Sequence, residues 1–320
     1  MPLTQLNFQP GLDTENTPTG AEGRWVDGDK IRFRKGLPQK IGGWTKFSAD
    51  YYVGIGRALE QWYSLDGSRY EALGTDRKIY VYQSGDNQDI TPIRSTDALV
   101  NAISTTTSSN IITITDTSHG ALQGDFVTLS SVSTAVAGIP AATLDAEYEI
   151  LSIANTNAYT IQSSATATAN AGPTANCTAA YQISTGPSVQ TFGYGWGSGT
   201  WGNSTWGTQR STSNVILDAR LWSINNWGED LIITQRDGST YEWDTSLGMS
   251  NNRAEVIANA PTNSTLSMIS TETRHVVCLG TETAIGNTAS VDKMFIRWSD
   301  QENYNQWTPN VTNSAGSQRI

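Results

Sequence analysis

The chain has 320 residues, enough for one large domain or two small ones with a buried core. Only 16% of the residues are charged, and 30 acidic against 20 basic residues give a formal net charge of −10. This excludes a protein that grips a phosphate backbone over its whole surface. The longest apolar runs, such as residues 135–142, are too short to span a membrane, and residues 1–11 lack a signal-peptide pattern. With two cysteines, neither a disulfide framework nor a zinc site is expected, and cytosolic assembly fits.

Residues 1–48 are the predicted N-terminal arm, where the basic residues concentrate. From residue 22 to residue 46 there are seven basic and three acidic residues. Alternation over residues 30–34 predicts a strand with one basic face. Such a face can contact nucleic acid or an acidic protein partner, and the acidic chain as a whole favours the protein partner. The candidate interface residues here are Trp25, Arg32, Arg34, Lys35 and Trp44.

Two segments, residues 49–94 and 215–320, contain short strands and turns with a weak internal repeat. Asp66-Gly67 and Asp237-Gly238 predict hairpin turns, because glycine tolerates the positive φ that such turns require. Units of roughly fifty residues with several short strands predict propeller blades over residues 49–94 and 215–320, and the set of blades in the second segment is expected to be incomplete. A set of unrelated hairpins is the alternative.

Between these segments, residues 95–186 have a different composition. No Lys or Arg occurs between Arg94 and Arg210, while six acidic residues lie between residues 95 and 186. Short β-branched runs separated by turn residues predict a small inserted β-sandwich or barrel rather than a disordered Ser/Thr/Ala linker. Because no segment has a sustained helical periodicity, the predicted fold class is all-β, with propeller-like blades and this inserted module.

Residues 187–214 alternate glycine with aromatic residues. They lack the preceding strand, the following helix and the lysine of a phosphate-binding loop. An extended segment that packs aromatic rings on a neighbouring surface is the better interpretation. The interface candidates in this Gly/Trp-rich connecting segment are Tyr194, Trp196, Trp201 and Trp206.

No catalytic, metal or cofactor site is expected. His119 and His275 are isolated, and Cys278 lies three residues beyond His275, so the two side chains would point to opposite faces of a strand. Turns containing acidic residues, such as 27–29 and 86–89, lack the spacing of a calcium loop. Four carboxylates could in principle serve a glycosidase-type pair. They are Glu60, Asp66, Glu229 and Asp230.

The sequence resembles structural proteins of short-tailed bacteriophage virions. The resemblance begins in residues 7–11 and in residues 21–44, AEGRWVDGDKIRFRKGLPQKIGGW. It continues in residues 193–243 and in residues 297–319. Ser118-His-Gly120 with Gly138-Ile-Pro140 is similar to a β-domain that recurs in phage structural proteins.

The resemblance implies a tail nozzle or packaged-DNA stabilisation protein with a β-propeller platform. Its expected partners are further copies in a homo-oligomeric ring such as a hexamer, the portal and adaptor, tail-fibre or needle proteins, and genomic DNA passing through an acidic or neutral channel. The expected location is the virion tail, after assembly in the host cytoplasm. A host-surface glycan-binding or glycan-cleaving propeller is the alternative, and a structural module whose basic strand contacts DNA is a third interpretation.

The length of the chain limits the number of propeller blades that it can form. Without the arm and the inserted module about 180 residues remain, which is three or four blades at roughly fifty residues each, whereas closed propellers need at least four. We therefore expect either a longer natural chain or partners that complete the blade set.

Overall fold

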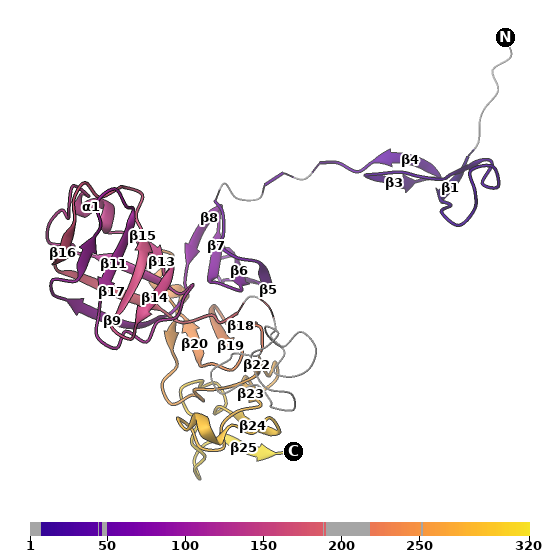
Figure 1. Ribbon diagram of the computed structural model, residues 1–320. Coiled ribbons are helices and arrows are strands. Elements are labelled where there is room, and N and C mark those ends of the chain that lie inside the picture. The colour runs from indigo at the N-terminus through magenta and orange to yellow at the C-terminus, as the bar shows by residue number, and fades with distance from the viewer. Residues whose placement is uncertain (1–7, 44, 47–49, 188, 190–217, 251) are drawn as a thin grey trace, which may run out of the picture. The chain divides into compact units, whose positions relative to one another are not determined.

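The computed structural model describes residues 8–43, 45–46, 50–187, 189, 218–250 and 252–320, and the chain falls into two compact units, Met1–Ala49 and Asp50–Ile320 (Figure 1). Almost all of the regular secondary structure in the described residues is β-strand. The other regular elements are the four-residue helix α1 (Ala141–Leu144) and the 3-10 turns η1 (Thr245–Leu247) and η2 (Thr288–Ser290). Among these residues no helix has the length and apolarity to cross a membrane. The predicted all-β fold class is confirmed.

The first unit contains two small pairs of strands. Strands β1 (Gln9–Leu12) and β2 (Arg24–Trp25) pair in parallel, and β3 (Ile31–Arg34) and β4 (Leu37–Lys40) form an antiparallel hairpin. Among the described residues of this unit, Ala21 is the one buried apolar side chain. The arm therefore has ordered backbone pairing with almost no core of its own.

Three four-stranded antiparallel sheets in the second unit are meanders, in which each strand pairs with the next one along the chain. The first meander sheet contains β5 (Gly56–Tyr63), β6 (Arg69–Thr75), β7 (Ile79–Gln83) and β8 (Asp86–Asp89). The second contains β18 (Trp222–Trp227), β19 (Asp230–Gln235), β20 (Thr240–Trp243) and β21 (Glu255–Val256). The third contains β22 (Leu266–Ile269), β23 (Val276–Leu279), β24 (Phe295–Trp298) and β25 (Gly316–Arg319).

The second meander sheet packs against both of the others, as neighbouring propeller blades do. Side chains alternate between the two faces of a strand, so Leu231 and Ile233 of β19 join a core with the first sheet. Ile232 points the other way and joins a core with Val276 and Cys278 of the third sheet. The first strand β18 contacts both β5 and β22, the first strands of the other two sheets. These contacts give the blade-like arrangement expected from the sequence.

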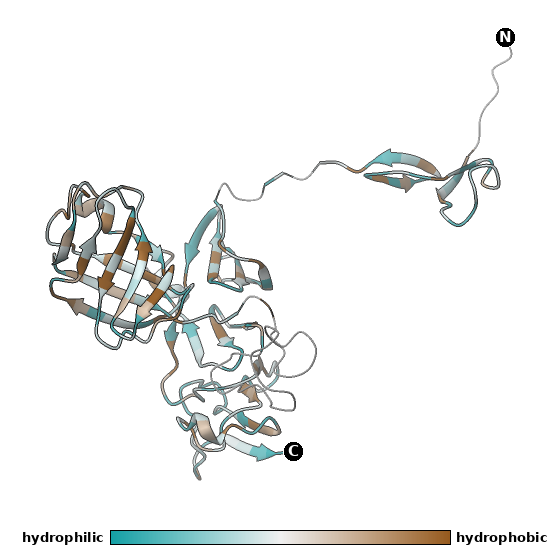
Figure 2. Ribbon diagram, viewed as in Figure 1, coloured by the Kyte–Doolittle hydropathy of each residue, from teal (hydrophilic) through white to brown (hydrophobic). Residues whose placement is uncertain are grey.

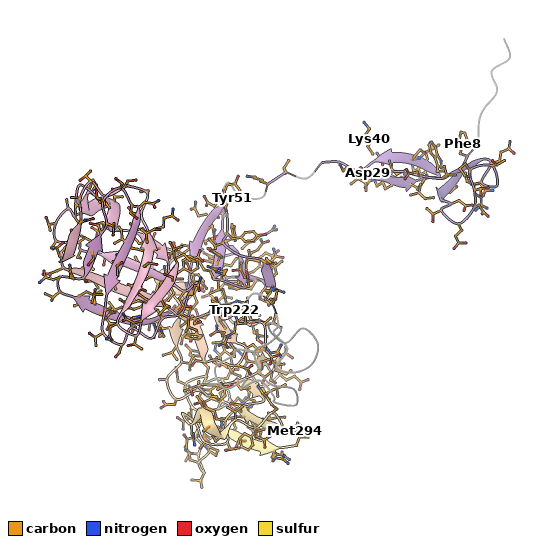
Figure 3. All side chains as sticks on the ribbon, in the orientation of Figure 1. Phe8, Asp29, Lys40, Tyr51, Trp222 and Met294 are labelled. Carbon is orange, nitrogen blue, oxygen red and sulfur yellow. The ribbon has the colours of Figure 1, made fainter. Side chains whose placement is uncertain are left out.

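Tryptophan side chains form the contact between the first two sheets. Trp222 packs against the backbone of Gly74, where an added Cβ would lie 2.6 Å from its Cδ1 atom. Its indole N–H donates to the Thr75 carbonyl at 2.6 Å, so this large side chain is buried without an unsatisfied donor. Figure 3 shows Trp222 where side chains of these sheets crowd together.

Residues 93–182 form the insert module, two sheets packed face to face. One sheet has the order β14 (Ser152–Asn155), β15 (Ala158–Gln162), β11 (Ile111–Thr115), β10 (Ile103–Thr105), β16 (Ala171–Thr174). The other has the order β13 (Glu147–Glu149), β12 (Phe126–Ser130), β17 (Cys177–Gln182), β9 (Ile93–Leu99). Apolar residues of both sheets form a separate core, and hydropathy alternates along the strands (Figure 2). The module is thus a β-sandwich.

The chain enters and leaves the insert module at neighbouring positions. Its first strand β9 pairs with its last strand β17, with Ile93 opposite Gln182. The Ile183 N–H then donates to the Pro92 carbonyl at 3.0 Å. The chain therefore leaves the first meander sheet after β8 and returns beside its exit point, which lets an entire sandwich be inserted between two blade-like sheets.

Candidate functional site

The basic strand predicted in the arm is β3, and its hairpin has a sharp turn. Lys35 and Gly36 both have positive φ, 52° and 79°, as a two-residue type I′ turn requires. Arg32 and Arg34 alternate with Ile31 and Phe33, so the two guanidinium groups share one exposed face. Arg32 Nε donates to Gln39 Oε1 across the hairpin at 3.2 Å.

The cations of this hairpin are available for a partner. Within the described part of the chain, Arg32, Arg34 and Lys35 have no ion pair. From residue 31 to residue 46 the sequence contains no acidic residue that could neutralise them locally. The hairpin therefore presents a concentrated positive charge to whatever lies next to it.

Trp25, the other predicted arm residue, is half-buried. Its ring lies 5.5 Å from that of Phe8, measured between centroids, in a tilted arrangement. Its indole N–H is shielded from solvent and has no acceptor among the described residues. The remaining predicted interface residues lie outside the described residues. They are Trp44, Tyr194, Trp196, Trp201 and Trp206.

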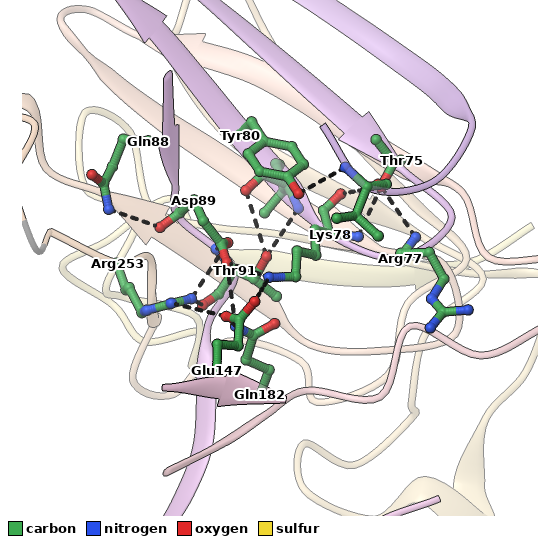
Figure 4. A network of polar contacts seen from close by, with 12 residues as sticks. Thr75, Arg77, Lys78, Tyr80, Gln88, Asp89, Thr91, Glu147, Gln182 and Arg253 are labelled. Carbon is green, nitrogen blue, oxygen red and sulfur yellow. Dashed lines mark hydrogen bonds and ion pairs between the residues drawn. The ribbon is translucent and has the colours of Figure 1, made fainter. Parts of the chain in front are cut away.

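A cluster of charges, which we call the module joint, connects three parts of the second unit (Figure 4). Lys78, next to β7, is 3% exposed and pairs with Asp89 of β8 at 2.9 Å and with Glu147 of the insert module. Arg253, beside the second meander sheet, approaches the same two carboxylates at 3.3 and 3.7 Å. Gln182, the last residue of the insert, donates to both at 3.2 and 2.6 Å.

The joint is electrically balanced and largely removed from water. Burial alone would raise the pKa of Asp89. The nearby cations Lys78 and Arg253 lower it by more than burial raises it, so the pKa of this carboxyl lies below its ordinary value. Lys78 also lies over the Phe126 ring of the insert, with its Nζ 4.4 Å from the centroid. Two cations and two carboxylates thus compensate each other where the insert module meets both sheets.

A second contact strengthens the joint. Arg77 pairs with Glu149 at 2.6 Å and donates to the Gly124 carbonyl at 3.1 Å, both in the insert module. The acidic residues of β13 are therefore neutralised by cations from outside the module. The joint was not predicted from the sequence, although residues 95–186 carry a signal for it: they contain six acidic and no basic residues, so their ion-pair partners must lie elsewhere.

Three of the four carboxylates considered for glycosidase-type chemistry accept backbone hydrogen bonds. Asp66 accepts from Ser68 N at 2.7 Å in its turn, and Glu229 accepts from Leu65 N at 2.6 Å. Asp230 accepts from Thr245 N at 3.0 Å. Burial raises the pKa of Glu60 and of Asp230.

One carboxylate–phenol pair has a geometry that a nucleophile could use. The Tyr304 hydroxyl donates to Glu242 Oε1 at 2.6 Å. Burial and this carboxylate both raise the pKa of Tyr304, and burial raises the pKa of Glu242. This hydrogen bond connects the loop after β24 of the third sheet to β20 of the second sheet.

The histidines and cysteines have structural contacts. His119 accepts from Ala121 N at 3.1 Å through Nδ1, and its Nε2 lies 3.2 Å from the Asn155 carbonyl. His275 Nδ1 lies 2.8 Å from the Ser299 carbonyl. Burial raises the pKa of Cys177 and of Cys278 to about 11, which keeps both thiols protonated and unreactive. Over the described ranges, no group of His, Cys, Asp and Glu side chains is arranged to hold a metal ion.

Comparison with known proteins gives little similarity. No family model matches the sequence, and no curated protein matches it. Among solved structures, the phage phi92 endosialidase aligns at 12% identity with a TM-score of 0.25, over 82% of this chain. This chain spans 38% of the length of that protein.

Proposed function

We propose that this chain is a non-enzymatic structural protein of a short bacteriophage tail. In this proposal it forms a homo-oligomeric ring attached below the portal and adaptor, located in the virion, where it retains or conducts the genome. The observation that carries the proposal is the arm, whose strands are ordered but whose side chains bury almost nothing within their own unit. The sequence resemblance described above indicates the kind of particle.

The arm needs a partner for energetic reasons. A two-stranded hairpin is marginally stable alone in water. Leu37 is 69% exposed, Ile41 46%, Phe8 45% and Leu12 43%. Contact with another chain would bury these side chains. This burial would stabilise the complex by about 25 cal/mol per Å² of apolar surface removed from water.

Charge favours a protein partner over DNA. Residues 1–49 contain seven basic and five acidic residues, a net of +2. Subtracting these from the totals of 20 and 30 leaves 13 basic and 25 acidic residues in residues 50–320, a net of −12. The arm of one copy is thus complementary in charge to the body of another. Such a body would also repel DNA weakly, which suits a surface along which a genome slides.

Purified particles of the phage that encodes this chain test the proposal. We expect mass spectrometry to find the protein in them and electron microscopy of antibody-labelled particles to place it in the tail. In vitro, the triple change Arg32→Ala, Arg34→Ala, Lys35→Ala should reduce incorporation of the chain into particles, whereas Lys293→Ala, at an exposed lysine in the loop before β24, should not. Absence from particles would overturn the proposal, and oligosaccharide cleavage by the pure chain would overturn its non-enzymatic part.

A further inference from the structure

The insert module shares no hydrophobic core with the meander sheets. Its own core lies between Leu99 and Tyr181, and the two cores between meander sheets contain no residue of its strands. Among the described residues, no insert strand contacts a meander strand to the extent that β18 contacts β5 or β22. Apolar burial is the dominant force that fixes packed elements in place. The position of the insert therefore depends on other contacts.

Ion pairs at β13 hold the insert to the first sheet (Figure 4). Glu147 pairs with the buried Lys78, and Glu149 pairs with Arg77 at 2.6 Å. Phe126, the insert ring at this place, lies against the same two cations, 4.4 Å from Lys78 Nζ and 5.2 Å from Arg77 Cζ. We call the ion pairs of Glu147 and Glu149 with these cations the latch. Its strength depends on two carboxylate charges rather than on buried apolar area.

The two connections between the insert and the sheets lie side by side at an irregular point of the backbone. Ile183 belongs to the core of the first and second sheets, whereas Tyr181 belongs to the insert core. The pairing of β17 with β9 is regular up to Tyr181 and shifts at Gln182, which leaves one extra residue on β9. Such a bulge interrupts the ladder and bends the strand. The boundary between the two cores thus falls on a weakened stretch of backbone.

We propose that the insert module is a hinged unit. The latch holds it in one orientation, and it turns about residues 93–95 and 182 when the latch opens. Turning leaves the hydrophobic cores on both sides intact, so the polar contacts supply the resistance to it. Hinges in proteins are commonly a few residues at the ends of elements that absorb the change in backbone angles. The inference concerns motion within one chain and does not depend on the function proposed above.

Distances between spin labels, measured by pulsed electron paramagnetic resonance on the full chain, test the hinge. One label would be attached at Val100→Cys, a 73% exposed position of the insert, and the other at Leu247→Cys, a 65% exposed position on η1. The native Cys177 and Cys278 are buried and should not be labelled. With the latch intact, we expect one narrow distance distribution.

Neutralising the latch should release the insert. In the labelled chain, Glu147→Gln with Glu149→Gln removes both carboxylate charges and nearly preserves side-chain size. We expect the distance distribution to broaden and to gain a second maximum. Asp86→Asn with Glu255→Gln is the matched control, because it makes the same change in net charge at exposed positions of β8 and β21. This control should leave the distribution unchanged.

A second variant, Arg77→Gln, opens only the partly exposed half of the latch, where the Arg77 side chain is 27% exposed, and leaves the buried Lys78 in place. It should also broaden the distribution, and it decides the question alone if circular dichroism shows that the double variant does not fold. A folded latch variant whose distribution is as narrow as that of the control would overturn the proposal. A distribution that is already broad with the latch intact would overturn it as well.

Discussion

At the scale of single residues, Lys78 stands out because its charged side chain is buried. A lysine that is 3% exposed is tolerated because Asp89 and Glu147 surround its ammonium group. Burying charges costs free energy that only good compensation offsets. The charges of the module joint therefore compensate each other only while all of them are present. Loss of any one side chain is expected to destabilise the fold.

We expect Lys78→Met to lower the free energy of unfolding by about 3–5 kcal/mol, because it leaves two carboxylates near a single remaining cation. Lys293, which is 58% exposed and paired with Asp237, is the control. Lys293→Met should cost less than about 1 kcal/mol, as exposed ion pairs do. Urea denaturation of both variants measures the difference, and equal effects would contradict the buried character of the joint.

Acid should weaken the joint through Asp89. Its pKa in the folded chain lies below the ordinary value, so the stability it contributes is present above the unfolded pKa of about 3.9 and is lost as pH falls through the folded pKa. We expect Asp89→Asn to be less stable than the unmodified chain at neutral pH, and this difference to shrink below about pH 4. Denaturation curves across that range measure it. A difference that stays constant with pH would show that the carboxylate charge is not responsible.

At the scale of elements, the packing of β18 on β6 depends on one missing side chain. Gly74 lets the Trp222 ring approach the backbone of β6 closely. Bulky side chains at both positions could not be accommodated at this distance between the sheets. The glycine thus determines how near two blade-like sheets can lie.

Gly74→Ala should therefore destabilise the chain by about 1–3 kcal/mol, the usual cost of overpacking a core. Gly172→Ala is the control, because an added Cβ there meets no atom within 4 Å. Thermal unfolding followed by circular dichroism would compare them. A neutral Gly74→Ala would show that the sheets can separate slightly at no cost.

At the scale of the whole molecule, the insert module has its own core and returns the chain to the place where it left. Residues 93–183 expressed alone should accordingly unfold in one cooperative thermal transition, measured by circular dichroism. Linear, non-cooperative melting would show instead that the module depends on the joint with Lys78 and Arg253 for its fold.

The sequence by itself determined the all-β class, because strand alternation is a local property that needs no partner to be read, and its charge composition predicted a separate insert. It also located the basic strand around Arg32 and Arg34, since alternation of charged and apolar residues fixes which face each side chain takes. What only the tertiary structure decided are contacts between segments distant in the chain. Lys78 meets Glu147 across 69 residues, and Trp222 meets Gly74 across an entire inserted sandwich. Such pairings depend on how sheets stack in space, and neither the sign of a charge nor the size of a side chain identifies its partner along the chain.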